Sequence, residues 1–224
     1  MDSSSGGFPE ALLTQPRKFK SRCIRLFRFL VEVLAVNNYS DIERFEMLRK
    51  SLAENGAEVT SADWTAARAS RFNEFDGVAL SGAPDMMSEE STQKKFRAEV
   101  EAIRDTHVPV LGVCFGHQLM AHAFGSFIVK DEENVVRFVK TTVLVTDPLF
   151  SGLPRNMMLL ESHHEVVRTL PADFQLIARS ETSPIAAMKH ERRPLYGVQF
   201  HPERYTPDNP AGKRVVGNFV KLLR

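Results

Sequence analysis

The residue best suited to take part in a chemical reaction is Cys114, one of only two cysteines in the chain. It stands between an apolar run typical of a buried strand and a segment with helical periodicity, in VPVLGVCFGHQLMAHAFG at 108–125. The motif GVCFG at 112–116 has the form of a nucleophile elbow with sulfur in place of the serine oxygen. The N–H groups that begin the following helix favour a thiolate. The pattern therefore predicts a nucleophilic cysteine, although a buried structural cysteine at a tight turn would have the same local signature.

A second motif, GVQFHPE at 197–203, supplies the partners that a nucleophilic cysteine needs. His201 and Glu203 follow another apolar run, at the carboxyl end of an expected strand, where parallel sheets place their ligand sites. We expect His201 to act as general base and acid, and Glu203 to orient its ring. Alone, His-Pro-Glu is more typical of a surface turn, so this interpretation depends on the cysteine motif.

The segment LSGAPD at 80–85 is a candidate for stabilising an oxyanion. Gly82 follows an expected strand and offers its backbone N–H without a side chain in the way, and Phe115, directly after the cysteine, offers a second N–H. Two such donors form an oxyanion hole in acyl-transfer enzymes. Taken singly, Ser-Gly-Ala-Pro is only a turn.

In their order and spacing, LSGAPD, GVCFGHQLMA and GVQFHPE resemble the class I glutamine amidotransferases, and the resemblance extends from about Val31 to the C-terminal end. It implies an α/β fold with a flavodoxin-like open, mostly parallel sheet, helices on both faces, and a small mixed or antiparallel strand insertion in the second half. The implied catalytic triad is Cys114, His201 and Glu203. The implied glutamine pocket is lined by Gln118, Ser162 and His163.

The resemblance also implies a reaction. The cysteine attacks the side-chain amide of glutamine, a γ-glutamyl thioester forms as ammonia leaves, and water releases glutamate. This chemistry requires no cofactor, and we expect none. The chain shows no Ser-Gly-Gly-x-Asp-Ser loop that would bind ATP pyrophosphate, so we expect the ammonia to pass to a separate synthetase subunit, of the ATP-pyrophosphatase type.

Two departures from the family pattern concern which branch of the class I amidotransferases the chain resembles. Ala83 stands where the family usually has glycine, and SHHE at 162–165 stands where the GMP synthetase branch more often shows Ser-His-x-Asp. The run SPIAAMKH followed by PLYGVQFHPE is nevertheless similar to that branch, which we therefore favour. Anthranilate and aminodeoxychorismate synthase subunits stay open, although their pattern favours serine where this chain has Arg204.

Two other classes of function also stay open. One is a stand-alone hydrolase of γ-glutamyl peptides or amides with the same fold and nucleophile. The other is a non-enzymatic binding module, against which the intact cysteine, histidine and glutamate argue. A metal site is not expected, because His117 and His122 are five residues apart, about 140° around a helix, and so do not share a face. The other residues that could contribute to such a site are Cys114, His163, His164 and His201.

The composition of the chain limits the kinds of binding partner that we expect. The 224 residues include 29 basic and 28 acidic ones, a net charge of +1, which indicates neither nucleic acid nor an anionic membrane as a partner. Every apolar run is shorter than the roughly 18 residues that span a bilayer. Two cysteines cannot make a disulfide framework, so we expect a reducing, cytoplasmic location.

The chain is expected to have one domain after a basic tail. Residues 1–28 are predicted to be disordered, with a targeting segment as the alternative, and residues 29–224 to form the amidotransferase domain. A helix is expected from Ser40 or Asp41 to Asn55-Gly56, because the apolar positions Ile42, Phe45, Leu48 and Leu52 follow helical spacing. Other helices are expected through Phe96, Val100 and Ile103 and at about 210–223. Strands are expected at FLVEVLAV, AEVTSAD, GVAL, VPVLGV, VKTTVLVT, MMLLES, FQLIARS, PIAAMKH and PLYGVQF.

Overall fold

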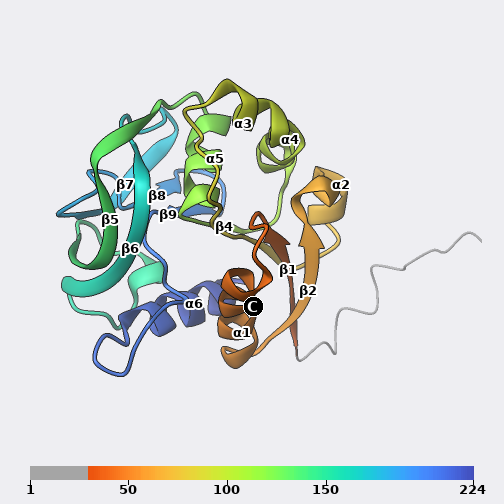
Figure 1. Ribbon diagram of the computed structural model, residues 1–224. Helices are drawn as coiled ribbons and strands as arrows, with labels where there is room; N and C mark the ends of the chain where they lie inside the picture. The colour runs from red at the N-terminus through yellow and green to blue at the C-terminus, as the bar shows by residue number, and fades with distance from the viewer. Residues whose placement is uncertain (1–29) are drawn as a thin grey trace, which may run out of the picture.

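The computed structural model describes residues 30–224, so the predicted tail and Cys23 lie outside the described residues. The parallel strands are β1 (Val31–Asn37), β2 (Ala57–Asp63), β3 (Gly77–Leu80), β4 (Val110–Val113) and β9 (Leu195–Val198). The antiparallel strands are β5 (Ile128–Val143), β6 (Asn156–Val167), β7 (Phe174–Ser180) and β8 (Ala187–His190). Together they form one nine-stranded sheet in the order β2-β1-β3-β4-β9-β8-β7-β5-β6 (Figure 1).

The parallel part confirms the predicted flavodoxin-like architecture, because its strand order runs 2-1-3-4 and continues into β9. β4 pairs in parallel with β3 and with β9, so the segments that follow these three strands emerge at one edge. The antiparallel part is larger than the small insertion that we expected. β5 has 16 residues and β6 has 12, and β8 pairs with β9, so these strands extend the main sheet.

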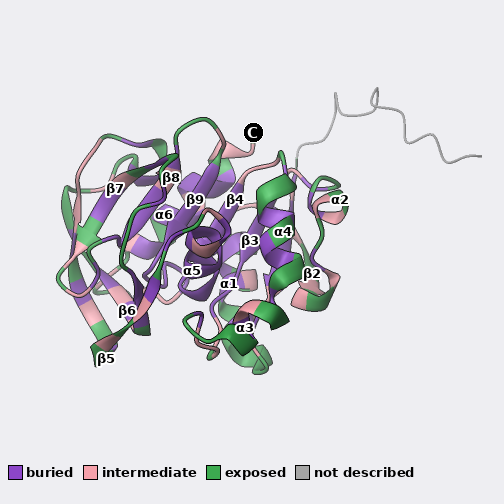
Figure 2. Ribbon diagram, turned by 90° about the horizontal axis from the view of Figure 1, so that it is seen from above, coloured by how far each residue is buried: buried purple, intermediate pink, exposed green. Residues whose placement is uncertain are grey.

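Helices cover both faces of the sheet, as predicted. On one face, α1 (Ile42–Glu54) and α6 (Ala211–Leu222) contribute to one apolar cluster, with the short η3 (Pro148–Phe150) beside α6. On the other face, α4 (Arg97–Asp105) and α5 (Phe115–Ala123) contribute to a second cluster, with α2 (Ala69–Phe72), α3 (Glu90–Lys95) and η2 (Trp64–Ala66) nearby. Figure 2 shows β3, β4 and β9 buried between these layers. No helix within residues 30–224 is long and apolar enough to cross a membrane.

The boundaries of α1 follow the predicted signals. Asp41 is the N-cap, and its carboxylate accepts the backbone N–H of Glu43 at 2.9 Å. Asn55 ends the helix, and Gly56 adopts a φ of +90°. Of the four apolar positions with helical spacing, Phe45, Leu48 and Leu52 are buried, whereas Ile42 is 72% exposed. Helical side chains lean toward the N-terminus, so that of the first residue extends past the end of the helix.

Candidate active site

Cys114 occupies a strained turn between β4 and α5. Its φ of 51° makes it the one non-glycine residue with positive φ among residues 30–224. A Cβ on Gly112 would lie 2.4 Å from the carbonyl oxygen of Gly116. A Cβ on Gly116 would lie 2.7 Å from the carbonyl oxygen of Leu80. Both glycines of GVCFG are therefore required for the close approach of strand and helix that the motif predicts.

His201 and Glu203 lie beside this turn because β9 pairs with β4. The register aligns Val113 with Val198, so the residues that follow both strands meet at the same edge. His201 Nδ1 lies 2.7 Å from Glu203 Oε1, and both side chains are buried. The turn packs against α6, since a Cβ on Gly212 would lie 2.3 Å from the carbonyl oxygen of Pro202.

The charge state of His201 results from opposing influences. Burial is the largest and would lower the pKa of the imidazole, but the charges on Glu203 and Cys114 and the hydrogen bonds to both raise it overall to about 10. The ring is therefore protonated at neutral pH, next to the cysteine sulfur. A cysteine nucleophile needs a proton-transferring group beside its sulfur, and His201 stands in that position.

Two further groups contact the sulfur. The Cys114 thiol lies 3.5 Å from the carbonyl oxygen of Ser162, in hydrogen-bonding geometry. The side-chain amide of Gln199 donates toward Cys114 Sγ at 3.7 Å. Sequence reasoning missed Gln199, although it stands directly after β9 and two residues before His201.

A cavity of about 170 Å³ opens beside Cys114. The three residues expected to line a glutamine pocket, Gln118, Ser162 and His163, all line it. The cavity is smaller than the 300–1,000 Å³ sites that take drug-sized ligands, so it suits a single amino acid. Arg44, from the start of α1, also lines it and places a cation at its edge. The sequence carried no motif for Arg44.

Gly82 lies in the site as expected, against a residue that no sequence motif indicated. A Cβ on Gly82 would lie 2.3 Å from the hydroxyl of Tyr39 and 3.2 Å from His201 Cε1. Burial, then the charges on Cys114 and Glu203, raise the pKa of Tyr39, so its hydroxyl stays protonated. Phe115 is the first residue of α5, where the N–H groups lack acceptors within the helix. Tyr39 was recognisable by its place just after β1, whose carboxyl end lies at the same edge of the sheet.

Comparison with known proteins assigns this arrangement to a family. The family model for glutamine amidotransferase class-I matches residues 34–222. The chain belongs to the class I glutamine amidotransferases. It is 41% identical over 146 residues, 65% of this chain and 74% of the relative, to a glutamine-hydrolyzing GMP synthase subunit of Pyrococcus abyssi. It is 30% identical over 194 residues to the GMP synthase subunit of the same name from Archaeoglobus fulgidus, covering 87% of this chain and 100% of that one.

A solved structure shares the fold of this amidotransferase. It is provisionally described as a GMP synthase subunit from Thermoplasma acidophilum. The two chains superpose with a TM-score of 0.78 at 28% identity, and the match covers 88% of this chain and 95% of that one.

The second departure from the family pattern, the glutamate at the end of SHHE where the GMP synthetase branch more often has aspartate, has a structural reason in this amidotransferase. Glu165, the last residue of SHHE, is buried, and its carboxylate accepts the backbone N–H of Met87 at 2.6 Å and that of Ser88 at 3.2 Å. Gln118 donates to the carbonyl oxygen of Glu165 at 2.9 Å. The carboxylate of Glu165 therefore ties the segment after Ala83 to the wall of the cavity.

Two buried histidines near the amidotransferase site have different roles in the fold. His163 Nε2 lies 2.7 Å from Glu161 Oε2, so its ring is held by a carboxylate that no motif predicted. Burial would raise the pKa of Glu161, but hydrogen bonds from His163, Thr182 and Ser180 lower it overall. His117 lies behind Cys114, where burial lowers its pKa to about 3, so this histidine is neutral.

A buried polar network supports the turn that contains Gly82. The backbone N–H of Asn38 donates to Ser81 Oγ at 2.9 Å, and Asn38 Nδ2 donates to Glu99 Oε1 at 3.2 Å. Glu99 is fully buried, which raises the pKa of its carboxyl to about 8 against the opposing hydrogen bond from Asn38. Asn38 thus joins the ends of β1 and β3, where Tyr39 and Gly82 lie, and Glu99 of α4 accepts a hydrogen bond from the Asn38 side chain.

Proposed function

We propose that this amidotransferase is the glutaminase subunit of a GMP synthetase whose ATP-pyrophosphatase chain is a separate polypeptide. The observation that carries the chemistry is the buried pair of His201 and Glu203 beside the strained Cys114. The choice of a GMP synthetase as the enzyme that receives the ammonia is supported by the relatives, which are named as glutamine-hydrolyzing subunits of GMP synthase.

In the first half of the reaction, the Cys114 thiolate attacks the side-chain carbonyl carbon of glutamine and a C–S bond forms. The carbonyl oxygen becomes an oxyanion, which accepts hydrogen bonds from the N–H groups of Gly82 and Phe115. His201 gives its proton to the amide nitrogen, the C–N bond breaks, and ammonia leaves. Gln118, Ser162 and His163 hold the substrate in the cavity beside the sulfur.

In the second half, His201 is neutral and accepts a proton from water. The hydroxide adds to the thioester carbon, the C–S bond breaks, and glutamate and the thiolate are released. Glu203 keeps the ring in place through Nδ1 and stabilises the imidazolium. Because the nucleophile must stay reduced, we propose a reducing, cytoplasmic location for the protein.

The nucleophile is tested by substitution. Cys114→Ala should abolish glutamate release from glutamine and leave the melting temperature nearly unchanged. Cys23→Ala is the matched control and should keep full activity. A glutamine-analogue electrophile should label Cys114 alone by peptide mass spectrometry. Labelling of Cys23, or substantial turnover by Cys114→Ala, would contradict the assignment.

The partner is tested by reconstitution. Adding the cognate ATP-pyrophosphatase chain with ATP and xanthosine monophosphate should raise glutamate release at least about tenfold, or roughly 1.4 kcal/mol of transition-state stabilisation. γ-Glutamyl dipeptides are assayed in parallel, because a complete Cys-His-Glu site in one chain also suits a stand-alone hydrolase. Rapid dipeptide cleavage without stimulation by a synthetase would replace the proposal with that alternative.

Residues 1–28 should be dispensable for this chemistry, because every proposed site residue lies in 30–224. A chain that begins at residue 29 should therefore keep the glutaminase activity and the melting temperature of the full chain. A loss of several degrees or of most of the activity would show that the first 28 residues belong to the folded amidotransferase domain.

A further inference from the structure

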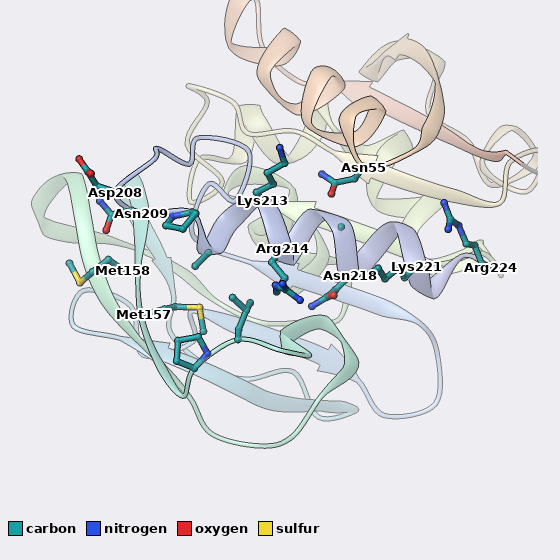
Figure 3. Close-up of a pocket in the computed structure, with 15 residues that line it drawn as sticks. Asn55, Met157, Met158, Asp208, Asn209, Lys213, Arg214, Asn218, Lys221 and Arg224 are labelled. Carbon is teal, nitrogen blue, oxygen red and sulfur yellow. The ribbon is translucent and has the colours of Figure 1, made fainter.

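A second cavity, of about 710 Å³, opens along α6 (Figure 3). We call it the α6 groove and define it by Leu153, Met157, Arg214, Gly217, Lys221 and Arg224. None of its described lining residues lines the cavity beside Cys114. The groove is thus a separate site, and its volume lies within the range of about 300–1,000 Å³ that small-molecule sites occupy.

The α6 groove concentrates positive charge in a chain that is close to neutral. Lys213, Arg214, Lys221 and Arg224 line it, and among the described lining residues Asp208 is the one acidic side chain. Lys213 approaches Glu54 at 3.9 Å. Within residues 30–224, Arg214, Lys221 and Arg224 have no acidic side chain within ion-pair distance. No acidic side chain within residues 30–224 therefore neutralises these three charges.

Two of these cations share a face of α6, two turns apart along the helix. Arg214 and Lys221 are seven residues apart, two helical turns, so they project from the same face of α6. Gly217 stands between them and adds no side chain. A Cβ on Gly217 would lie 2.6 Å from Asn55 Oδ1, so the glycine keeps α6 close to the end of α1.

The opposite wall of the α6 groove is apolar. Leu153, Pro154, Met157 and Met158 line it, and Met158 is 41% exposed. Figure 3 shows Met157 and Met158 on the β6 side and the basic side chains on the α6 side. Methionine side chains adapt to flat or irregular ligands. A ligand that fills the groove therefore needs an anionic part and an apolar part.

We propose that the α6 groove binds a phosphorylated small molecule of the nucleoside phosphate class. Phosphate oxygens accept hydrogen bonds from the guanidinium of Arg214 and the ammonium of Lys221. The base packs against Met157 and Met158. This site is independent of the glutaminase chemistry and does not involve Cys114 or His201.

The test is isothermal titration calorimetry of the full chain with ATP as the probe, at 50 mM and 300 mM NaCl. Arg214→Gln/Lys221→Gln should weaken ATP binding at least about tenfold. Arg68→Gln/Lys94→Gln, which removes the same charge from exposed positions outside the groove, should leave it unchanged. Higher salt should weaken binding to the wild type, because exposed charges are screened. Cys114→Ala should bind ATP like the wild type.

One further ligand and one further variant separate the parts of the site. Inorganic pyrophosphate should bind more weakly than ATP and lose affinity in the Arg214/Lys221 variant. Met158→Gln should weaken ATP binding severalfold without changing pyrophosphate binding, because only the base contacts the apolar wall.

Three results would overturn the proposal. The first is no detectable binding of ATP at millimolar concentration. The second is an equal loss of ATP affinity in the Arg68/Lys94 control. The third is binding of a hexaglutamate peptide in the groove where ATP and pyrophosphate do not bind, which would make it a docking surface for an acidic protein segment. Circular dichroism melts of all variants exclude unfolding as the cause of lost binding.

Discussion

The hydroxyl of Tyr39 lies directly against Gly82, so close that a Cβ on the glycine would be 2.3 Å from the phenolic oxygen. The same phenol lies in the electrostatic field of Cys114 and Glu203, which together with burial raises its pKa. Glu203 Oε2 is buried and has no hydrogen-bond partner within the described part of the chain. Tyr39 therefore brings a protonated donor to a site that gathers negative charge.

Tyr39→Phe should lower the kcat of glutamine hydrolysis by about tenfold, the effect of roughly 1.4 kcal/mol. The phenyl ring keeps its packing, so the melting temperature should change by less than about 2 °C. KM should stay within about twofold, because Tyr39 does not line the cavity beside Cys114. An unchanged kcat would show that the hydroxyl only fills space next to Gly82.

Substitutions of His201 and Glu203 should lower the rate of glutamine hydrolysis by unequal amounts. His201→Ala removes the proton donor and acceptor of both half-reactions, whereas Glu203→Gln removes the charge that orients the ring and raises its pKa. Glu203→Gln should therefore retain more glutamine hydrolysis than His201→Ala in steady-state assays of glutamate release. Equal losses at unchanged thermal stability would assign a direct proton-transfer role to Glu203.

The close contact between Gly116 and Leu80 predicts a steric defect. Gly116→Ala places a methyl group 2.7 Å from the carbonyl oxygen of Leu80, so β3 and α5 must separate. We expect a loss of about 1–3 kcal/mol in the free energy of unfolding, measured with urea, and a large fall in kcat. Gly125→Ala is the control, because its Cβ would meet no atom within 4 Å. Its positive φ of 82° should cost about 1 kcal/mol and leave kcat nearly unchanged.

The buried carboxyl of Glu99 predicts a pH dependence of stability. Its pKa is raised by burial from 4.5 to about 8, so the folded state holds a proton that the unfolded state releases between these pH values. The stabilisation is complete below about pH 4.5 and is lost as the pH rises through about 8. Glu99→Gln keeps the size of the side chain and cannot ionise.

The free energy of unfolding of the wild type, relative to that of Glu99→Gln, should therefore fall from pH 5 to pH 8 by at least about 1 kcal/mol. Urea titrations of both proteins at pH 5, 6.5 and 8 measure this difference, and other titrating groups cancel in the comparison. Parallel stability curves for the two proteins would show that Glu99 is ionised in the folded state.

The sequence by itself determined the positions of several strands and the turns that end them. AEVTSAD, GVAL and FQLIARS coincide with β2, β3 and β7, because short apolar or alternating runs between turn residues have few other structures open to them. GVCFG and HPE follow strands of one parallel sheet, and parallel neighbours end at a common edge. The proximity of Cys114 to His201 could therefore be predicted without coordinates.

Only the tertiary structure decided which other groups surround these residues. Tyr39, Glu161 and Arg44 carry no motif of their own. They enter the site because the end of β1, the middle of β6 and the start of α1 lie beside it. The antiparallel strands β5, β6, β7 and β8 join the same sheet through pairings between segments that are distant in the chain. The pKa of His201 and the charge of the α6 groove likewise depend on burial and on distances between charges. Both are properties of the folded arrangement, because desolvation and Coulomb energy arise between atoms that are neighbours in space rather than in the chain.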